Sequence, residues 1–271
     1  MNAISLPPVP PQSCSPHGHL DRLAAKYGVT LQENLHLFER CEESDAISGA
    51  ILPGWCLCDE EGRDLSGRSG IPLLPWRSER RFIELRNLVT TRTVETVCLW
   101  RSRCLSSPER WTLSQAIYRE IGLCQWVLGE PFVSVYAATH TDIVANIIGR
   151  LASGIACGIE ISLALPADSP LMDRHEAISR RGVASDQVVD SIVRPSSVYV
   201  MSEQGLQSYL DTDSELFGLG ENQAALVREA FSSIRQPENS GADLATHQQI
   251  CRVVAAVSRS VKSNKRIDLV P

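Results

Sequence analysis

The sequence lacks both an apolar run long enough to cross a membrane and an excess of positive charge. Its longest apolar stretch, Ile155–Leu165, is interrupted by Gly158 and Glu160 and is far shorter than the ~20 residues of a transmembrane helix. The 271 residues include 26 basic and 32 acidic ones, which gives a net charge of −6. We therefore expect no membrane segment and, because nucleic acids attract basic surfaces, no nucleic-acid partner.

The motifs of nucleotide, nucleophile and metal chemistry are missing as well. The chain has no G-x-G-x-x-G dinucleotide loop, no P-loop and no G-x-S-x-G nucleophile turn. Cys56 and Cys58 form a single C-x-C pair with no second C-x-C or H-x-H nearby, which favours buried or surface thiols over zinc. We therefore predict no bound cofactor and no metal.

The N-terminal residues carry no export signal, because a basic segment followed by an apolar one is absent. Pro7–Pro16 contains five prolines, so residues 1–19 are predicted to form a proline-rich arm. Residues 20–271 are predicted to form one α+β domain, since 43% of the chain is hydrophobic and can build a core. Without an export signal, the nine cysteines are expected in the reducing cytoplasm.

Hydrophobic periodicity predicts helices at both ends of this domain and strands between them. Helices are predicted over Leu20–Tyr27, Leu113–Leu128, Ala224–Ile234 and Ile250–Val261, the second ending at Gly129. Strands are predicted over Val29–Leu37, Arg81–Leu88, Thr93–Trp100, Phe132–Ala138, Ile155–Leu165, Ala184–Val193 and Ser197–Met201. Residues 53–75, rich in glycine and proline, are predicted to be a loop region with a hairpin or insertion. We predict an α+β fold with a predominantly antiparallel open sheet and helices on one face.

The strand Ile155–Leu165 has the clearest alternation. Its odd positions are apolar, whereas its even positions, including Gly158, Glu160 and Ser162, are small or polar. One face of the sheet is therefore expected to contact helices, and the other to face solvent, a ligand or another subunit.

Several strings, taken in order, resemble one known family. Leu23–Val29, Gln32–Phe38, Trp126–Pro131 and Ile250–Leu269 are similar to segments of the C-terminal, substrate-binding half of the Gfo/Idh/MocA oxidoreductases, the glucose–fructose oxidoreductase and inositol dehydrogenase group. The resemblance covers about residues 20–270 and implies the α+β fold of that half. It does not extend to the family's Rossmann domain, whose glycine-rich loop the sequence lacks.

The positions of the family's proton-transferring residues are also changed. Counting back from Leu128-Gly129-Glu130-Pro131 places the Asp and His of the family's D-x-x-x-H motif at Gln115 and Arg119. Glutamine does not titrate and arginine stays protonated, so this pair cannot relay a proton. The family's Glu-Lys-Pro lysine has no counterpart, because no lysine precedes Lys26. A self-sufficient NAD(P)-dependent dehydrogenase is therefore not expected.

Two groups of residues remain as a candidate site. Arg119 is predicted to bind an anionic ligand group from a partly exposed position, with Gln115 beside it and Tyr118 as a tentative catalytic residue. The other group comprises the substrate-binding candidates Glu33 and Asn34 and a potential acid or base, His36. A surface salt bridge for Arg119 and a purely structural role for His36 are the competing interpretations.

Two charged strings are open to two interpretations each. Asp173–Glu176 is placed in a connection between strands, either as a loop that serves a site or as a solvated turn with local ion pairs. Asp211–Glu215 loosely resembles a calcium loop but lacks its glycine, so capping of a helix is favoured.

These features leave three functional hypotheses. The first is a cofactor-free domain that binds a small anionic or polar molecule. It could catalyse non-redox chemistry such as isomerisation, elimination or cyclisation, and a location of its gene in a biosynthetic cluster would favour this hypothesis. The second is a non-catalytic partner or regulatory subunit of a full-length oxidoreductase. The third is an oxidoreductase whose NAD domain lies on another chain. The second would pair through its sheet with that oxidoreductase. We also predict a homodimer formed through the open sheet face.

Overall fold

The computed structural model describes residues 51–66, 70–167, 169–187, 197–202, 205–210 and 221–269. Its largest element is a nine-stranded sheet with the order β10-β9-β8-β7-β3-β6-β5-β4-β11. The strands are β3 (Val97–Leu105), β4 (Phe132–His140), β5 (Val144–Leu151), β6 (Ala156–Ser162), β7 (Met172–Ser179), β8 (Val183–Ser185), β9 (Ser197–Ser202), β10 (Gly205–Leu210) and β11 (Ile267–Asp268). Every neighbouring pair is antiparallel except the parallel pair β3–β6. The predicted α+β class with a predominantly antiparallel open sheet is confirmed.

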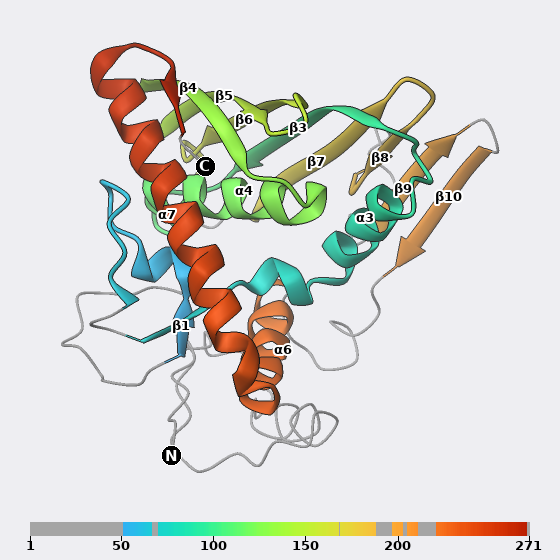
Figure 1. Ribbon diagram of the computed structural model, residues 1–271, viewed down its shortest axis with the longest axis horizontal. Coiled ribbons are helices and arrows are strands. Elements are labelled where there is room, and N and C mark those ends of the chain that lie inside the picture. Colours follow the sequence, from blue (N-terminus) through green and yellow to red (C-terminus); the bar gives the residue numbers. More distant parts are fainter. Residues whose placement is uncertain are drawn as a thin grey trace.

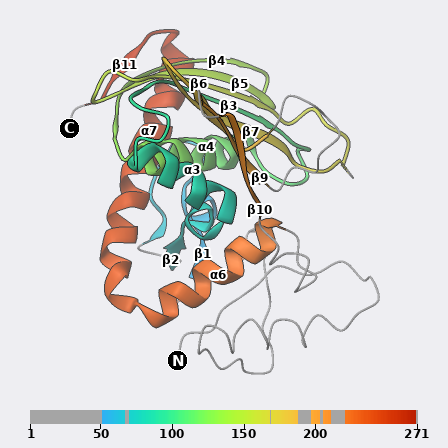
Figure 2. The same cartoon turned by 90° about the vertical axis from the view of Figure 1, so that its right-hand side faces the viewer.

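Helices cover one face of this sheet (Figure 1). They are α3 (Arg80–Thr90), α4 (Leu113–Leu128), α6 (Glu221–Arg235) and α7 (Ser240–Ser263), with short 3-10 helices η1 (Gly54–Leu57), η2 (Pro75–Ser78) and η3 (Pro237–Asn239). Figure 2 shows α3 and α4 directly beneath the sheet, and α6 with the short strands β1 (Ile51–Pro53) and β2 (Ile71–Leu73) farther below. No helix in the described part of the chain is both long and apolar enough to cross a bilayer.

Helix α4 forms where the periodicity predicts it, and both of its ends are defined by local interactions. At the N-terminus, the Thr112 hydroxyl accepts a hydrogen bond from the Gln115 backbone, and the Gln115 side chain accepts one from Thr112. At the C-terminus, Gly129 takes a left-handed conformation with φ of +71°. Most of the helix is buried between the sheet and α7, so it forms the centre of the core.

The alternation in β6 is confirmed, whereas the predicted strand Arg81–Leu88 is wrong. Cys157, Ile159 and Ile161 are buried, as expected for the face that contacts the helices. Residues 80–90 instead form α3, because Phe82, Leu85 and Leu88 recur every three residues and bury one helical face. The buried Arg81 breaks the apolar pattern of this helix and conceals its period.

Other predicted boundaries also change. The strand predicted from Thr93 begins only at Val97, after Arg92 and Glu95 adopt left-handed backbone conformations. In the described part of region 53–75, β1 and β2 pair in parallel, and residues 57–65 form a short hairpin-like turn with one antiparallel bridge between Cys58 and Asp64. Asp173–Glu176 lies within the central strand β7, so neither a loop nor a solvated turn is correct. Strands β5 and β10 were not predicted, and the strand predicted over 184–193 is seen only as β8.

Several predictions lie outside the described residues. They are the arm at residues 1–19, the helix Leu20–Tyr27, the strand Val29–Leu37 and the capping segment Asp211–Glu215.

Candidate functional site

Helix α4 carries three of the predicted site residues, but their side chains take three different directions. Gln115 caps its own helix, Tyr118 reaches His247 on α7, and Arg119 enters a buried cluster of charges beneath the sheet. The structure therefore does not bring these three groups together at one point. The other candidates, Glu33, Asn34 and His36, lie outside the described residues, so their roles stay predictions.

We call the charges around Arg119 the ion-pair cluster. Three basic and four acidic side chains form it, all of them buried: Arg81, Arg119, His175, Glu79, Glu120, Asp173 and Asp186. They come from α3, α4, β7 and the residues that flank α3 and β8. Charges of both signs are needed together here, because a single unpaired charge in a protein interior is strongly unfavourable.

Asp173 is the centre of the ion-pair cluster. Its two carboxylate oxygens accept a bidentate pair of hydrogen bonds from Arg81, at 2.7 and 2.8 Å, and a third at 2.6 Å from Arg119. Burial alone would raise the pKa of this carboxyl, but the two guanidinium groups outweigh it and hold the pKa well below its usual value. Asp173 is therefore an anion throughout the physiological pH range.

His175 connects the two remaining carboxyl groups of the ion-pair cluster. Its Nδ1 lies 2.6 Å from Asp186 Oδ2, and its Nε2 lies 3.0 Å from Glu120 Oε2. Burial opposes protonation of the ring, but Asp186 and Glu120 outweigh it and raise the pKa of His175 to about 10. The imidazole is therefore a cation at neutral pH, and both of its nitrogens donate hydrogen bonds.

Arg119 is fully committed to this cluster. Its side chain contacts Asp173 and Glu120, its guanidinium lies 5.4 Å from the Trp111 ring, and the residue is only 3% exposed. The expectation of a partly exposed Arg119 is wrong, because two acidic partners far apart in sequence stabilise it inside the core. Its proposed role in ligand binding stays a prediction that this pairing disfavours.

Tyr118 belongs to a second buried hydrogen-bonded group. Its hydroxyl lies 2.7 Å from Nδ1 of His247, whose Nε2 lies 3.0 Å from Asp64 and 3.5 Å from the Cys251 sulfur. Burial raises the pKa of the Tyr118 hydroxyl. Burial also lowers the pKa of His247, because its effect outweighs that of Asp64, which alone would raise this pKa. Both groups are therefore neutral at physiological pH.

Access to Tyr118 is also restricted. A Cβ atom built on Gly54 would lie 2.2 Å from the Tyr118 hydroxyl, so the η1 backbone covers this group closely. The catalytic role of Tyr118 stays a prediction. Sequence reasoning missed His247 and Asp64, although His247 and Cys251 are spaced by four residues and share one face of α7.

A cavity of about 410 Å³ opens near the N-terminal end of α4, between this helix, α7 and the turn that joins β4 to β5. Its walls are mainly apolar and include Trp111, Leu113, Ile117, Leu163, Val254 and Val257. Polar groups at its edge include Thr112, Ser114, Thr139, Asp142, Ser258 and Lys262. A mostly apolar cavity with a few polar groups is typical of a small-molecule site.

Two local features bear on whether the described residues could hold a nicotinamide cofactor or a metal. After β1, the chain enters the 3-10 helix η1 instead of the glycine-rich turn and α-helix that bind a pyrophosphate. Cys58 is buried, and nowhere in the described ranges do three His, Cys, Asp or Glu side chains converge as metal ligands do.

No protein-family model matches the chain, and neither does any curated protein. Solved structures do match it. An oxidoreductase domain protein from Kribbella flavida aligns at 14% identity and a TM-score of 0.66, over 82% of this chain and 74% of that chain. A levoglucosan dehydrogenase, in complex with NADH and L-sorbose, aligns at 12% identity and a TM-score of 0.65. The alignment covers 81% of this chain and 73% of that chain. An inositol dehydrogenase homolog from Azotobacter vinelandii, complexed with NADH and myo-inositol, aligns at 13% identity and a TM-score of 0.58. The alignment covers 93% of this chain and 75% of that chain.

These likenesses show that the chain has the fold of Gfo/Idh/MocA-type oxidoreductases, so the resemblance seen in the sequence is confirmed at the level of fold. At identities this low, they carry no information about substrate or activity.

Replacing Arg119 with Met is expected to destabilise the protein by about 3 kcal/mol or more, because Asp173 and Glu120 lose a buried cation. Urea unfolding measures this loss. Arg80→Met, at a largely exposed residue paired with Glu84, is the control and should cost less than about 1 kcal/mol. A loss of under ~1 kcal/mol for Arg119→Met would contradict a structural role.

The raised pKa of His175 also makes stability depend on pH. Because the folded state holds this proton up to about pH 10 and the unfolded state only to its ordinary value of 6.5, the contribution is complete below pH 6.5. It is then lost as the pH rises through 10. We expect the free energy of unfolding to fall between pH 7 and 10, and to fall less steeply in His175→Gln. Parallel curves for the two proteins would show that His175 is neutral when folded.

Proposed function

We propose that this chain is a non-redox binding domain with an oxidoreductase fold, not a self-sufficient dehydrogenase. One observation carries the proposal: Asp173 and Glu120 hold the charge of Arg119 in place, at the helix position where the sequence resemblance puts the family's histidine. A guanidinium paired in this way neither accepts nor releases a proton near neutral pH. Gln115, at the position of the family's aspartate, caps its helix and cannot titrate.

The ligand of such a domain is proposed to be a small molecule in the cavity of about 410 Å³ between α4 and α7. The apolar walls suit a hydrocarbon portion of the ligand. The hydroxyls of Thr139 and Ser258 support a polar end at the edge of the cavity, where Glu60 and Asp142 also line the wall and Lys262 is paired with Glu61.

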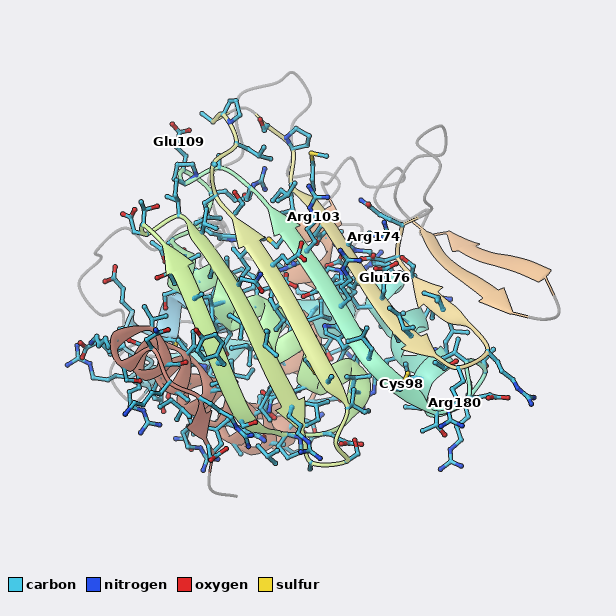
Figure 3. The ribbon with its side chains drawn as sticks, turned by 90° about the horizontal axis from the view of Figure 1, so that it is seen from above. Cys98, Arg103, Glu109, Arg174, Glu176 and Arg180 are labelled. Carbon is cyan, nitrogen blue, oxygen red and sulfur yellow. The ribbon has the colours of Figure 1, made fainter. Side chains whose placement is uncertain are left out.

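The open face of the sheet is proposed to bind a second copy of the chain. Figure 3 shows this face without a covering helix. Ile148 protrudes from it, 59% exposed, opposite Gly158 on the next strand, where a Cβ atom would meet nothing within 4 Å. A two-fold axis can therefore place Ile148 of each copy over Gly158 of the other.

Charges on the open face are equally suited to self-association. Arg101 and Glu160 lie 3.8 Å apart on adjacent strands, and Arg174 pairs with Glu176 on β7. Groups of both signs can therefore exchange partners between two copies, without the repulsion that a face of one sign would produce.

A second candidate function is a non-catalytic subunit of a full-length oxidoreductase. The same exposed sheet face favours it, because Ile148 and Met172 are more than half exposed and could contact a different chain of the same fold. Co-expression with such a chain separates the two, because only the second candidate gives a hetero-oligomer.

The non-redox assignment is tested with the substrates of the structural neighbours. Incubation with NAD⁺ or NADP⁺ and myo-inositol or levoglucosan should give no rise in absorbance from reduced nucleotide, because Gln115 and Arg119 stand where the resembled family has its proton-transferring aspartate and histidine. Val257→Phe, which fills the α4–α7 cavity, should abolish the co-purification of any small molecule detected by mass spectrometry. Turnover that falls in folded Arg119→Met protein would overturn the proposal.

Replacing Ile148 with Asp is expected to convert the dimer to a monomer, because two carboxylates would be buried where apolar groups meet. Light scattering should change from about twice the chain mass of 29.8 kDa to that mass. Ala152→Asp, at an exposed position in the turn after β5, is the control and should remain dimeric. A monomeric wild-type protein at high concentration would contradict the predicted homodimer.

A further inference from the structure

The contact between helix α6 and the short helix η2 contains a buried carboxyl group. Glu229, in the second half of α6, is only 7% exposed, and its Oε2 accepts a hydrogen bond from the hydroxyl of Ser78, the last residue of η2. Arg228, its neighbour on α6, donates to the backbone carbonyl of Ser78 at 3.3 Å. Two consecutive residues of α6 are therefore hydrogen-bonded to the same residue of η2.

Glu229 has no cation as a partner. Within the described part of the chain, the Ser78 hydroxyl is its one hydrogen-bond donor, and no arginine, lysine or histidine forms an ion pair with it. Arg77 of η2 acts on this carboxyl electrostatically, but its own ion pair is with Asp243 of α7. In the ion-pair cluster, by contrast, every buried acid contacts a cation.

The other charges around this carboxyl do not replace a partner. Asp243 adds a second negative charge, which makes ionisation of Glu229 less favourable. Among the other described elements that α6 contacts, β2 has no charged residue, and Glu238 of η3 is exposed. An ionised Glu229 is therefore buried with a single neutral donor, which costs free energy.

These surroundings move the titration of Glu229 to neutral pH. Burial raises the pKa of its carboxyl from 4.5 to about 7, against the opposing effects of the Ser78 hydroxyl and Arg77. While α6 is attached to η2, the group is therefore mostly protonated below pH 7 and mostly ionised above it.

We propose that the contact of α6 with η2 is a pH-sensitive switch, in which α6 stays attached while Glu229 is protonated and detaches more often once this carboxyl is ionised. Detachment lets water solvate the carboxylate, so ionisation favours it. Detachment also exposes the apolar side chains that α6 buries, which include Ala225, Val227 and Phe231. Such an opening involves one part of the fold and leaves the rest folded.

This inference does not depend on the proposed function. Neither Glu229 nor Ser78 lines the cavity between α4 and α7, and neither belongs to the open sheet. The ligand of that cavity, the non-redox assignment and the homodimer could each fail while α6 still responds to pH.

Proton linkage gives the sign and the size of the effect. The protonated carboxyl stabilises the attached helix fully below pH 4.5, and this contribution is lost as the pH rises through about 7. The equilibrium constant for detachment of α6 should therefore rise at least ~10-fold between pH 5 and pH 8.

Hydrogen exchange of the full chain, followed by mass spectrometry at both pH values, measures this opening. After correction for the intrinsic pH dependence of amide exchange, protection of α6 should fall at least ~10-fold from pH 5 to pH 8. Glu229→Gln keeps the size of the side chain without its charge, so protection should fall less than ~3-fold. Glu238→Gln, at the exposed acid of η3, is the control and should behave as the wild type does.

Ser78→Ala tests the same contact with the carboxyl in place. Its hydroxyl opposes the rise in the pKa of Glu229, so removing it should move the loss of α6 protection to higher pH. Circular dichroism verifies that each variant is folded.

Three results would overturn the inference. They are equal protection of α6 at pH 5 and pH 8 in the wild type, an equal fall in the wild type and in folded Glu229→Gln protein, and an unshifted midpoint in folded Ser78→Ala protein. The second result would trace the pH dependence to another group, such as His175.

Discussion

The carboxylate of Asp173 is the constraint on which the rest of the structure depends. It receives hydrogen bonds from Arg81 at the start of α3 and from Arg119 in the middle of α4, so one group on β7 fixes both helices against the sheet. His175, on the same face of the same strand, connects Glu120 of α4 with Asp186 after β8. The relative positions of two helices and two strands are thus set by charge as well as by apolar contact.

This arrangement explains how α4 accommodates an arginine in the middle of the core, at a position where the sequence resemblance predicts a histidine. A buried cation can replace another residue only where acidic partners surround it, and Asp173 and Glu120 provide them for Arg119. The ion-pair cluster then separates the two ends of α4. A mainly apolar cavity lies at the N-terminal end, and a smaller one lined by Arg77, Arg86, Gln125 and Glu130 lies at the C-terminal end.

The sequence was sufficient to predict α4, its end at Gly129 and the alternation of β6, because these depend on local periodicity and capping. It was not sufficient for α3 or β7, since both carry buried charges that resemble solvent-exposed residues. Arg81 and Asp173 are 92 residues apart, so nothing local indicates that each neutralises the other. The helix that carries Gln115, Tyr118 and Arg119 was therefore predicted correctly, whereas the burial of Arg119 was not predicted.

The parallel pairing of β3 with β6 has a consequence for how the chain folds. β3 lies between β6 and β7, so α4, β4 and β5 must all be formed or bypassed before β3 gains either neighbour. Pairings between such distant segments close large loops, and loop closure slows folding. Until β7 arrives, Arg81 and Arg119 are solvated cations without their shared partner. β7 follows the other central strands in the chain and carries the carboxylate of Asp173, so its pairing with β3 also neutralises the two buried cations.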